Sequence, residues 1–261
     1  MINLPNKIKT NIKSKSFIPE SIGKSGADVL CFDDCVLKIS TVDDESDREI
    51  MMLRYLADKA PVPEIIASEQ QNGKNYLLMS RVSGQMACSR ELLQNPVCLA
   101  ETLTEGLHLL WDVDIDESKN LLTLDKKLKL AEMRVAEDLV DTDDCEPETY
   151  GENGFENPEQ LLMWLEANKP EEELVLSHGD YCLPNIFIND DKISGFIDLG
   201  RCGVSDKYQD IALCYRSFKG NLRGDYGGRS ISFDCNYIFD CLGIVPDWDK
   251  LNYYILLDEL F

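Results

Sequence analysis

The most constraining feature of this chain is a set of polar residues at fixed spacing. His178-Gly179-Asp180 is followed by Asn185 and, thirteen residues later, by Asp198-Leu199-Gly200. Two β-prone segments around a turn at residues 189–191 lie between Asn185 and Asp198, which predicts a hairpin. A hairpin there brings an amide oxygen and a carboxylate onto one hard cation, with Asp180 nearby. The pattern therefore predicts a metal site bounded by three oxygen-bearing side chains.

The interval from Asp180 to Asn185 equals that in the catalytic loop of protein kinases. In those enzymes the Asp faces the attacking hydroxyl, and the Asn holds magnesium together with the Asp of a later Asp-Phe-Gly. Lys38, at the end of a predicted strand, and Glu49, on the helix after it, match the pair that anchors the α- and β-phosphates. Upstream, Gly23-Lys24-Ser25-Gly26 could cover the phosphates with backbone N–H groups, although the full glycine pattern is absent.

Each of these features also has a structural explanation. Asp180 and Asn185 could satisfy turn backbones, and Asp198-Leu199-Gly200 could be an ordinary strand exit. Lys38 and Glu49 taken alone would be a surface ion pair of about 0–1 kcal/mol. Their occurrence in this order along one chain favours the catalytic interpretation. His178, between Ser177 and Gly179, is expected to brace the loop and not to transfer protons.

Charge and cysteine content exclude several classes of protein. The net charge of −22 argues against a nucleic-acid partner, which the surface would repel. No apolar run approaches the roughly 20 residues of a membrane span, and the N-terminus lacks a secretory signal, so export is not expected. The ten cysteines are interpreted as reduced thiols, because no Cys-x-x-Cys pair occurs. With only two histidines, a structural zinc site is also not expected.

The acidity lies in the second part of the chain. Residues 80–261 hold 36 acidic and 16 basic side chains, and residues 137–173 contain 14 carboxylates against Lys169 alone. Such a surface could steer a polycationic ligand, or it could serve only for solubility.

Hydrophobic periodicity divides the chain into a β-rich and a helical part. We expect a hairpin over 29–39 ending at Lys38, a helix before Pro61, and two strands flanking Asn72-Gly73. Ser83-Gly84 breaks the pattern and marks a linker. Beyond it the sequence predicts helices at 99–111, 124–139, 206–216, 236–242 and 248–260, three strands at 174–176, 186–188 and 193–197, and an irregular loop at 219–232.

The chain resembles the aminoglycoside phosphotransferases, most closely the 3′-phosphotransferases that act on kanamycin-type antibiotics. The resemblance covers nearly the whole sequence. Its most specific segments are Leu176 to Asp180, Ser194 to Arg201, Asp210-Ile211-Ala212 and the terminus Tyr253 to Phe261. The catalytic segments are shared with choline, homoserine and fructosamine kinases, whereas the ending Asp-Glu-Leu-Phe is similar to the 3′-phosphotransferases specifically.

The resemblance implies an α+β, bilobal, protein-kinase-like fold. Residues 1–82 would form a nucleotide-binding lobe, with an antiparallel sheet and one main helix. Residues 83–261 would form a larger, mainly helical lobe for catalysis and aminoglycoside binding. The expected cofactors are ATP and Mg²⁺, and the expected partner is the aminoglycoside, without nucleic acid or membrane. The protein is expected in the cytoplasm as a monomer or weak dimer.

The resemblance also implies roles for individual residues. Asp180 would be the catalytic aspartate, and Asn185 with Asp198 would bind the metal. The nucleotide would be bound by Ser25, Gly26, Lys38, Glu49, Ser80, Val82 and Ile197. The aminoglycoside would be bound by Asp180, Arg201, Glu146, Glu148, Asp258, Glu259 and Phe261. A pocket lined by carboxylates suits a substrate with several ammonium groups, because each charge-assisted contact contributes about 1.5–3 kcal/mol.

The chain departs from the family pattern at three places. Val36 stands where an aromatic residue usually stacks on adenine. Lys219-Gly220 replaces an acidic drug contact, and the acidic insertion around 150–157 differs in length and composition. These departures bear on which drugs are accepted. The residues alone leave two other functions open. One is a kinase of another small cationic or sugar substrate, and the other is a non-catalytic nucleotide-binding protein.

Overall fold

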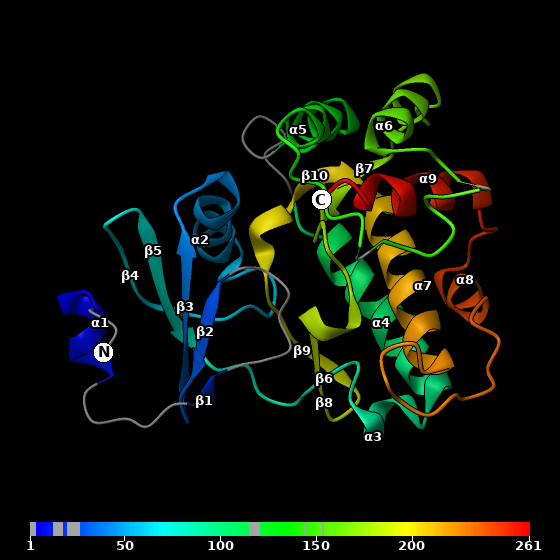
Figure 1. Ribbon diagram of the computed structural model, residues 1–261. Coiled ribbons are helices and arrows are strands. Elements are labelled where there is room, and N and C mark those ends of the chain that lie inside the picture. The colour runs from blue at the N-terminus through cyan, green and yellow to red at the C-terminus, as the bar shows by residue number, and fades with distance from the viewer. Residues whose placement is uncertain (1–3, 13–17, 20–26, 115–120, 144, 153) are drawn as a thin grey trace. The chain divides into compact units, whose positions relative to one another are not determined.

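The computed structural model describes residues 4–12, 18–19, 27–114, 121–143, 145–152 and 154–261 (Figure 1). Its chain divides into two compact units. Unit 1 consists of residues 1–87 and 184–202, and unit 2 of residues 88–183 and 203–261. The segment that carries Asn185 and Asp198 therefore belongs, by its contacts, with the N-terminal unit. Asp180 belongs to unit 2.

Unit 1 is built on a five-stranded antiparallel sheet with the strand order β1-β2-β3-β5-β4. Asn72 and Gly73 both have positive φ, at 54° and 74°, so they form the tight turn that the Asn-Gly pair predicts. The strands are β1 (Ile18–Pro19), β2 (Asp28–Cys31), β3 (Cys35–Thr41), β4 (Ile65–Gln71) and β5 (Lys74–Ser80).

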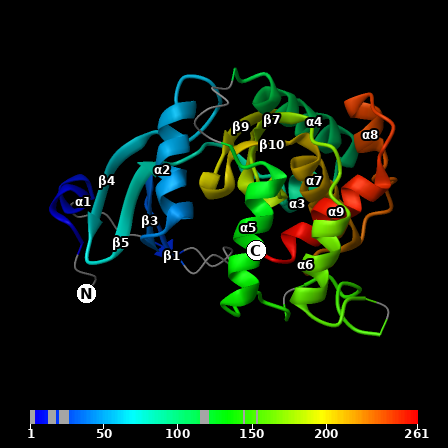
Figure 2. The same ribbon diagram turned by 90° about the horizontal axis from the view of Figure 1, so that it is seen from above.

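Two helices lie on opposite faces of this sheet (Figures 1 and 2). On one face, Ile8 of α1 (Asn6–Asn11) is buried in a cluster with Leu37 and Ile39 of β3. Side chains alternate along a strand, so Lys38 points to the other face. There α2 (Asp44–Leu56) contacts β4 and β5. The alternation of β3 thus separates an apolar face from the face that carries Lys38.

A second, smaller sheet completes unit 1. It has the order β6-β8-β9, formed by β6 (Gln85–Met86), β8 (Ile186–Asn189) and β9 (Lys192–Phe196). The short 3-10 turns η1 (Leu183–Asn185) and η2 (Leu199–Arg201) flank the β8–β9 hairpin. Gly195 is required for close packing, because a Cβ built there would lie 2.3 Å from Cγ1 of Val82.

We predict that Gly195→Ala lowers the free energy of unfolding by about 1–3 kcal/mol, because the added methyl group overlaps Val82. The double variant Gly195→Ala/Val82→Ala removes the overlap and should be destabilised by less than the sum of the two single changes. Urea unfolding of the four proteins measures this coupling. Strict additivity would contradict the packing described for this hairpin.

Unit 2 is mainly helical, with one antiparallel pair of strands, β7 (Leu174–Ser177) and β10 (Gly203–Asp206). Helix α7 contacts β7, α4 and α9, so it lies at the centre of this unit. The helices are α3 (Arg90–Leu93), α4 (Pro96–Trp111), α5 (Leu124–Ala136), α6 (Pro158–Ala167), α7 (Lys207–Arg223), α8 (Tyr237–Leu242) and α9 (Trp248–Asp258).

No helix among the described residues is long and apolar enough to cross a membrane. All ten cysteines lie within the described residues, and no disulfide joins any of them there.

The main elements expected from the sequence are present, and three expectations need correction. The prediction of a loop from residue 219 is wrong at its start, because α7 continues to Arg223. Gly224 ends this helix in the left-handed conformation, and the N–H groups of Gly224 and Asp225 both donate to Gly220 O. Strand β3 runs on to Thr41, so Lys38 lies inside the strand. The sequence patterns do not predict the helices α1, α3 and α6.

Candidate active site

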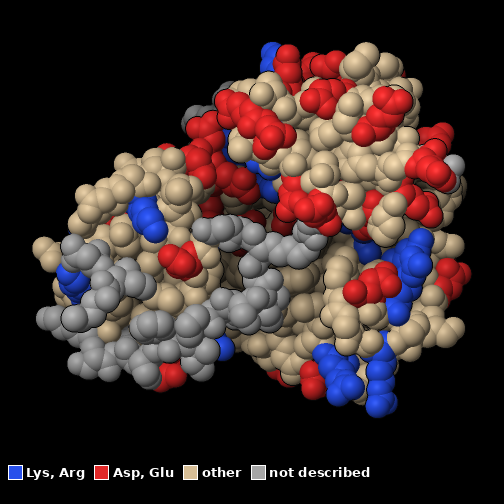
Figure 3. Space-filling view, viewed as in Figure 1, with Lys and Arg blue, Asp and Glu red and all other residues tan. Residues whose placement is uncertain are grey.

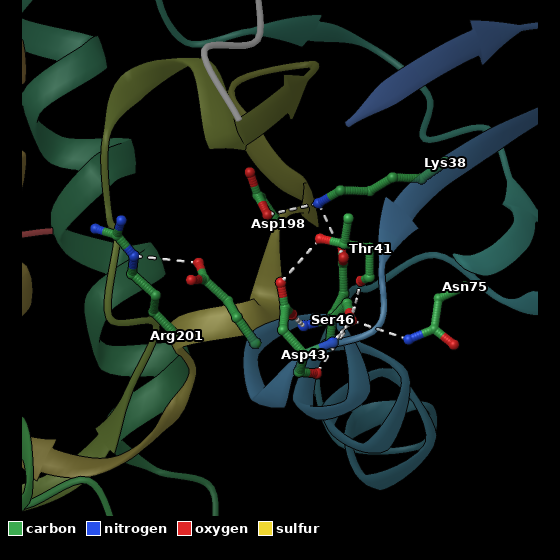
Figure 4. A network of polar contacts seen from close by, with 9 residues as sticks. Lys38, Thr41, Asp43, Ser46, Asn75, Asp198 and Arg201 are labelled. Carbon is green, nitrogen blue, oxygen red and sulfur yellow. Dashed lines mark hydrogen bonds and ion pairs between the residues drawn. The ribbon is translucent and has the colours of Figure 1, made fainter. Parts of the chain in front are cut away.

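An ion-paired network in unit 1 brings three predicted site residues together (Figure 4). Lys38 Nζ lies 2.9 Å from Glu49 Oε2 and 2.8 Å from Asp198 Oδ1. The side chains of Lys38 and Glu49 are only 12% and 5% exposed, whereas that of Asp198 is 36% exposed. Burial acts to lower the pKa of Lys38, but the charges of Glu49 and Asp198 outweigh it and raise the pKa. Lys38 is therefore held as a cation between two carboxylates.

The start of α2 is fixed by a capping box, which helps to position Glu49 in the second turn. Asp43 Oδ1 accepts a hydrogen bond from Ser46 N at 2.7 Å, and Asp43 N donates to Ser46 Oγ at 3.1 Å. Asn75 Nδ2 of β5 also donates to Ser46 Oγ, at 2.9 Å. The helix terminus is thus tied to the sheet that carries Lys38.

Asp198 has an uncommon backbone conformation, with φ 60° and ψ 59°. Non-glycine residues reach this left-handed region at a cost of about 1 kcal/mol or more, and such residues concentrate at functional sites. Just before it, Ile197 N donates to Asn185 O at 3.0 Å, so the two ends of the β8–β9 hairpin lie side by side. The structure therefore brings together the main chains on which the two predicted metal ligands stand.

The residues after Asp198 contact the first turn of α2. A Cβ on Gly200 would lie 2.6 Å from Glu45 Cγ, so glycine permits this approach. Arg201, predicted to bind substrate, has its Nε 3.2 Å from Glu45 Oε1. A pairing between Arg201 and Glu45 was not apparent from the sequence, because 156 residues separate them.

The remaining predicted nucleotide contacts lie at or just beyond the ends of strands in unit 1. Ser80 ends β5, where its N–H donates to Glu64 O and its hydroxyl accepts from Glu64 N. Val82 packs on Gly195, and Ile197 is half-buried. Val36 lies on the same face of β3 as Lys38, by the alternation of the strand. Ser25 and Gly26 lie outside the described residues.

In unit 2, the loop that carries Asp180 is fixed by a buried carboxylate. Asp210 of α7 is fully buried and accepts hydrogen bonds from His178 N at 2.8 Å, Gly179 N at 2.9 Å and Ser177 Oγ at 2.9 Å. A carboxylate that accepts several hydrogen bonds is stabilised against the penalty of burial. The sequence contained a signal for this role, because Asp210 begins one of the family-like segments.

His178 has the bracing role predicted for it. Its Nδ1 accepts from Asp180 N at 3.3 Å, and its ring stands edge-on to Tyr181. The Tyr181 hydroxyl donates to Leu103 O of α4 at 2.8 Å. Leu183 N donates to Ser217 Oγ of α7 at 3.0 Å, so both helices position this loop.

A cluster of carboxylates surrounds Arg216 of α7, also in unit 2. The guanidinium pairs with Asp258, and it lies 3.4 Å from Glu259 Oε1 and 4.0 Å from Glu146 Oε1. Glu146 N donates to Glu259 Oε2 at 3.1 Å, which ties the acidic loop to the C-terminal segment. Three of the predicted substrate contacts are therefore neighbours, whereas Glu148 lies in an exposed turn. On the face shown in Figure 3, several carboxylates lie where Figure 1 draws α5 and α6.

The last residues are also tied to α5. Arg134 Nε donates to Leu260 O at 2.7 Å, and Arg134 Nη2 donates to the main-chain oxygen of Phe261 at 3.2 Å. This contact to Phe261, a predicted substrate residue, was not anticipated from the sequence. Two arginines, from α5 and α7, thus hold the acidic terminus.

Glu259 is expected to change its charge near neutral pH. Burial raises its pKa to about 7, despite the opposing charge of Arg216. The folded state then retains a proton that the unfolded chain releases near pH 4.5. The associated stability is complete below pH 4.5 and is lost as the pH rises through about 7.

We therefore predict that Glu259→Gln flattens the dependence of stability on pH. Between pH 5 and pH 8 the unchanged protein should lose about 1–3 kcal/mol more of its free energy of unfolding than the variant does. Urea unfolding at a series of pH values measures the difference. Parallel curves for the two proteins would contradict the raised pKa.

The fold and the two sets of side chains define a protein of the kinase-like class. The model of the phosphotransferase enzyme family matches residues 33–251. The chain belongs to this family. It is 42% identical to an aminoglycoside 3′-phosphotransferase of Enterococcus faecalis, over 86% of this chain and 81% of that protein. It is 29% identical to one of Acinetobacter baumannii, over 99% and 100% of the two chains.

Solved structures bear out the fold class. The crystal structure of an aminoglycoside 3′-phosphotransferase of type VIII superposes with a TM-score of 0.79 at 23% identity, covering 97% of this chain and 96% of that one. An aminoglycoside phosphotransferase of Streptomyces rimosus gives a TM-score of 0.78 at 23% identity, covering 97% and 95%. The expected α+β, protein-kinase-like fold is confirmed.

Proposed function

We propose that this protein transfers the γ-phosphate of ATP to the 3′-hydroxyl of an aminoglycoside. The observation that carries the proposal is the acidic cluster of Glu146, Asp258 and Glu259 in the same unit as the braced Asp180 loop. A substrate with several ammonium groups would find carboxylates there, each charge-assisted contact contributing about 1.5–3 kcal/mol. The relatives named aminoglycoside 3′-phosphotransferase support the same substrate class.

Unit 1 provides the residues suited to the nucleotide. Lys38, held by Glu49, offers a fixed positive charge for the α- and β-phosphates. Ser80, Val82 and Ile197 would contact the base, and Ser25 with Gly26 would cover the phosphates. Since these roles follow from resemblance and position, they are part of the proposal.

Asn185 and Asp198 would hold Mg²⁺. An amide oxygen and a partly exposed carboxylate are hard oxygen donors, and they fit an ion that takes its other ligands from phosphates and water. The bound ion would neutralise charge on the phosphate oxygens.

Asp180 would orient the attacking hydroxyl. The oxygen of this hydroxyl forms a bond to the γ-phosphorus, while the bond from this phosphorus to the oxygen of the leaving ADP breaks. The hydroxyl proton passes to Asp180 and then to solvent. Because the transition state is loose, most of the rate gain comes from positioning, for which the Asp210 brace provides a rigid support.

The aminoglycoside would be held by Arg201, Glu146, Glu148, Asp258, Glu259 and Phe261 together with Asp180. In the described structure Arg216 already neutralises part of this set. We also infer that the protein acts in the cytoplasm, where ATP is present and cysteines stay reduced, as a monomer or weak dimer.

We predict that Asp180→Asn lowers kcat for kanamycin about 10²–10⁴-fold, because the hydroxyl loses its orienting base. The KM for ATP should stay within about threefold, since Asp180 is not assigned to the nucleotide. Steady-state phosphorylation assays measure both constants.

The matched control for this experiment is Asp190→Asn, on the exposed turn between β8 and β9. Asn tolerates the left-handed conformation of this residue, so near-normal turnover is expected. A normal kcat for Asp180→Asn would overturn the catalytic assignment.

A further inference from the structure

Position 220 lies under an aromatic ring. A Cβ built on Gly220 would lie 2.9 Å from Tyr226 Cε2, 3.1 Å from its hydroxyl oxygen and 3.2 Å from its Cζ. Any side chain at 220 would therefore displace Tyr226. The tyrosine ring thus occupies the space beside position 220, where the family pattern has an acidic contact and this chain has glycine.

The ring lies beside the acidic cluster. Gly220 follows Arg216 by four residues on α7, so the two positions share one face of the helix. Arg216 is the residue that pairs with Asp258 and Glu259. Partial desolvation raises the pKa of Tyr226; the charge of Arg216 acts against this, and the charges of Cys182 and Glu146 add to it. The contact of the ring with Gly220 places Tyr226 on the side of α7 that carries Arg216.

The side chain of Tyr226 is largely exposed to solvent. The residue is 63% exposed, far more than a tyrosine that serves the core. Gly224, with φ 86°, turns the chain back after α7 so that this short loop returns over the helix. A Cβ on Gly224 would meet Gly228 O at 2.8 Å, which shows that the returning loop packs closely on itself.

We propose that Tyr226 is a specificity-determining residue of the aminoglycoside pocket, an inference that rests on the proposed function. The ring face would contact a sugar ring or attract an ammonium group, and the hydroxyl would accept or donate one hydrogen bond. A neutral aromatic surface thereby takes the place of a carboxylate. Substrate selection at this end of the pocket then depends on stacking more than on charge.

The test is steady-state kinetics with a panel of aminoglycosides at saturating ATP. Tyr226→Ala should raise the KM for accepted substrates about tenfold, with kcat and the KM for ATP within twofold. Tyr226→Phe keeps the ring and should stay within about threefold of the unchanged protein. Gly220→Ala, which displaces the ring without removing it, should resemble Tyr226→Ala. The control is Arg229→Ala, an exposed change in the same loop, with no expected effect on any constant.

The outcomes separate this inference from the proposed function. If the unchanged protein phosphorylates no aminoglycoside, the proposed function fails. If it does so and Tyr226→Ala matches it within twofold for every substrate, only the role of Tyr226 is overturned. A purely structural role would instead lower the melting temperature and alter both KM values together, and that result would also overturn the inference.

Discussion

The ion pairs of Lys38 hold unit 1 in the form that its proposed chemistry needs. One ammonium group joins a strand, a helix and the end of a hairpin through Glu49 and Asp198. Removing Lys38 would leave a partly buried carboxylate without a counter-charge. This lowers the free energy of unfolding far more than the loss of a surface ion pair does. The capping box of α2 and the contact of Gly200 with Glu45 help to fix the positions of α2 and of the segment after Asp198. The sheet, α2 and the hairpin therefore depend on one another.

In unit 2 the charges are reversed, because an arginine lies among carboxylates. Its carboxylates at 258 and 259 repel one another, and Arg216 offsets this repulsion from the middle of α7. Burial combined with this pairing leaves Glu259 with a pKa close to neutrality. Each unit thus contains its own counter-charge: carboxylates beside the lysine suited to phosphate, and an arginine beside the carboxylates suited to ammonium groups. A bound ligand of matching charge would compete with, or extend, these internal pairs.

The local features of this arrangement could be predicted from the sequence, whereas several long-range contacts could not. The hairpin between Asn185 and Asp198 follows from residue spacing, and the positions of Lys38 and Glu49 follow from strand and helix patterns. Asp210 lies in a family-like segment, but its hydrogen bonds to the Asp180 loop depend on full burial, which periodicity does not predict. The contact of Tyr226 with Gly220 depends on a reversing loop and has no signal in the sequence. The sequence predicts the end of α7 too early, because Gly220 resembles a helix breaker, whereas Gly224 ends the helix.

The central claim is that phosphate is transferred to one particular hydroxyl of an amino sugar. The most direct measurement is nuclear magnetic resonance of the product isolated after incubation with ATP, Mg²⁺ and kanamycin. Our account predicts a single phosphorus resonance coupled to the proton on carbon 3′. It would be contradicted by a phosphate on any other position, or by unchanged kanamycin after complete incubation with a folded protein that binds ATP.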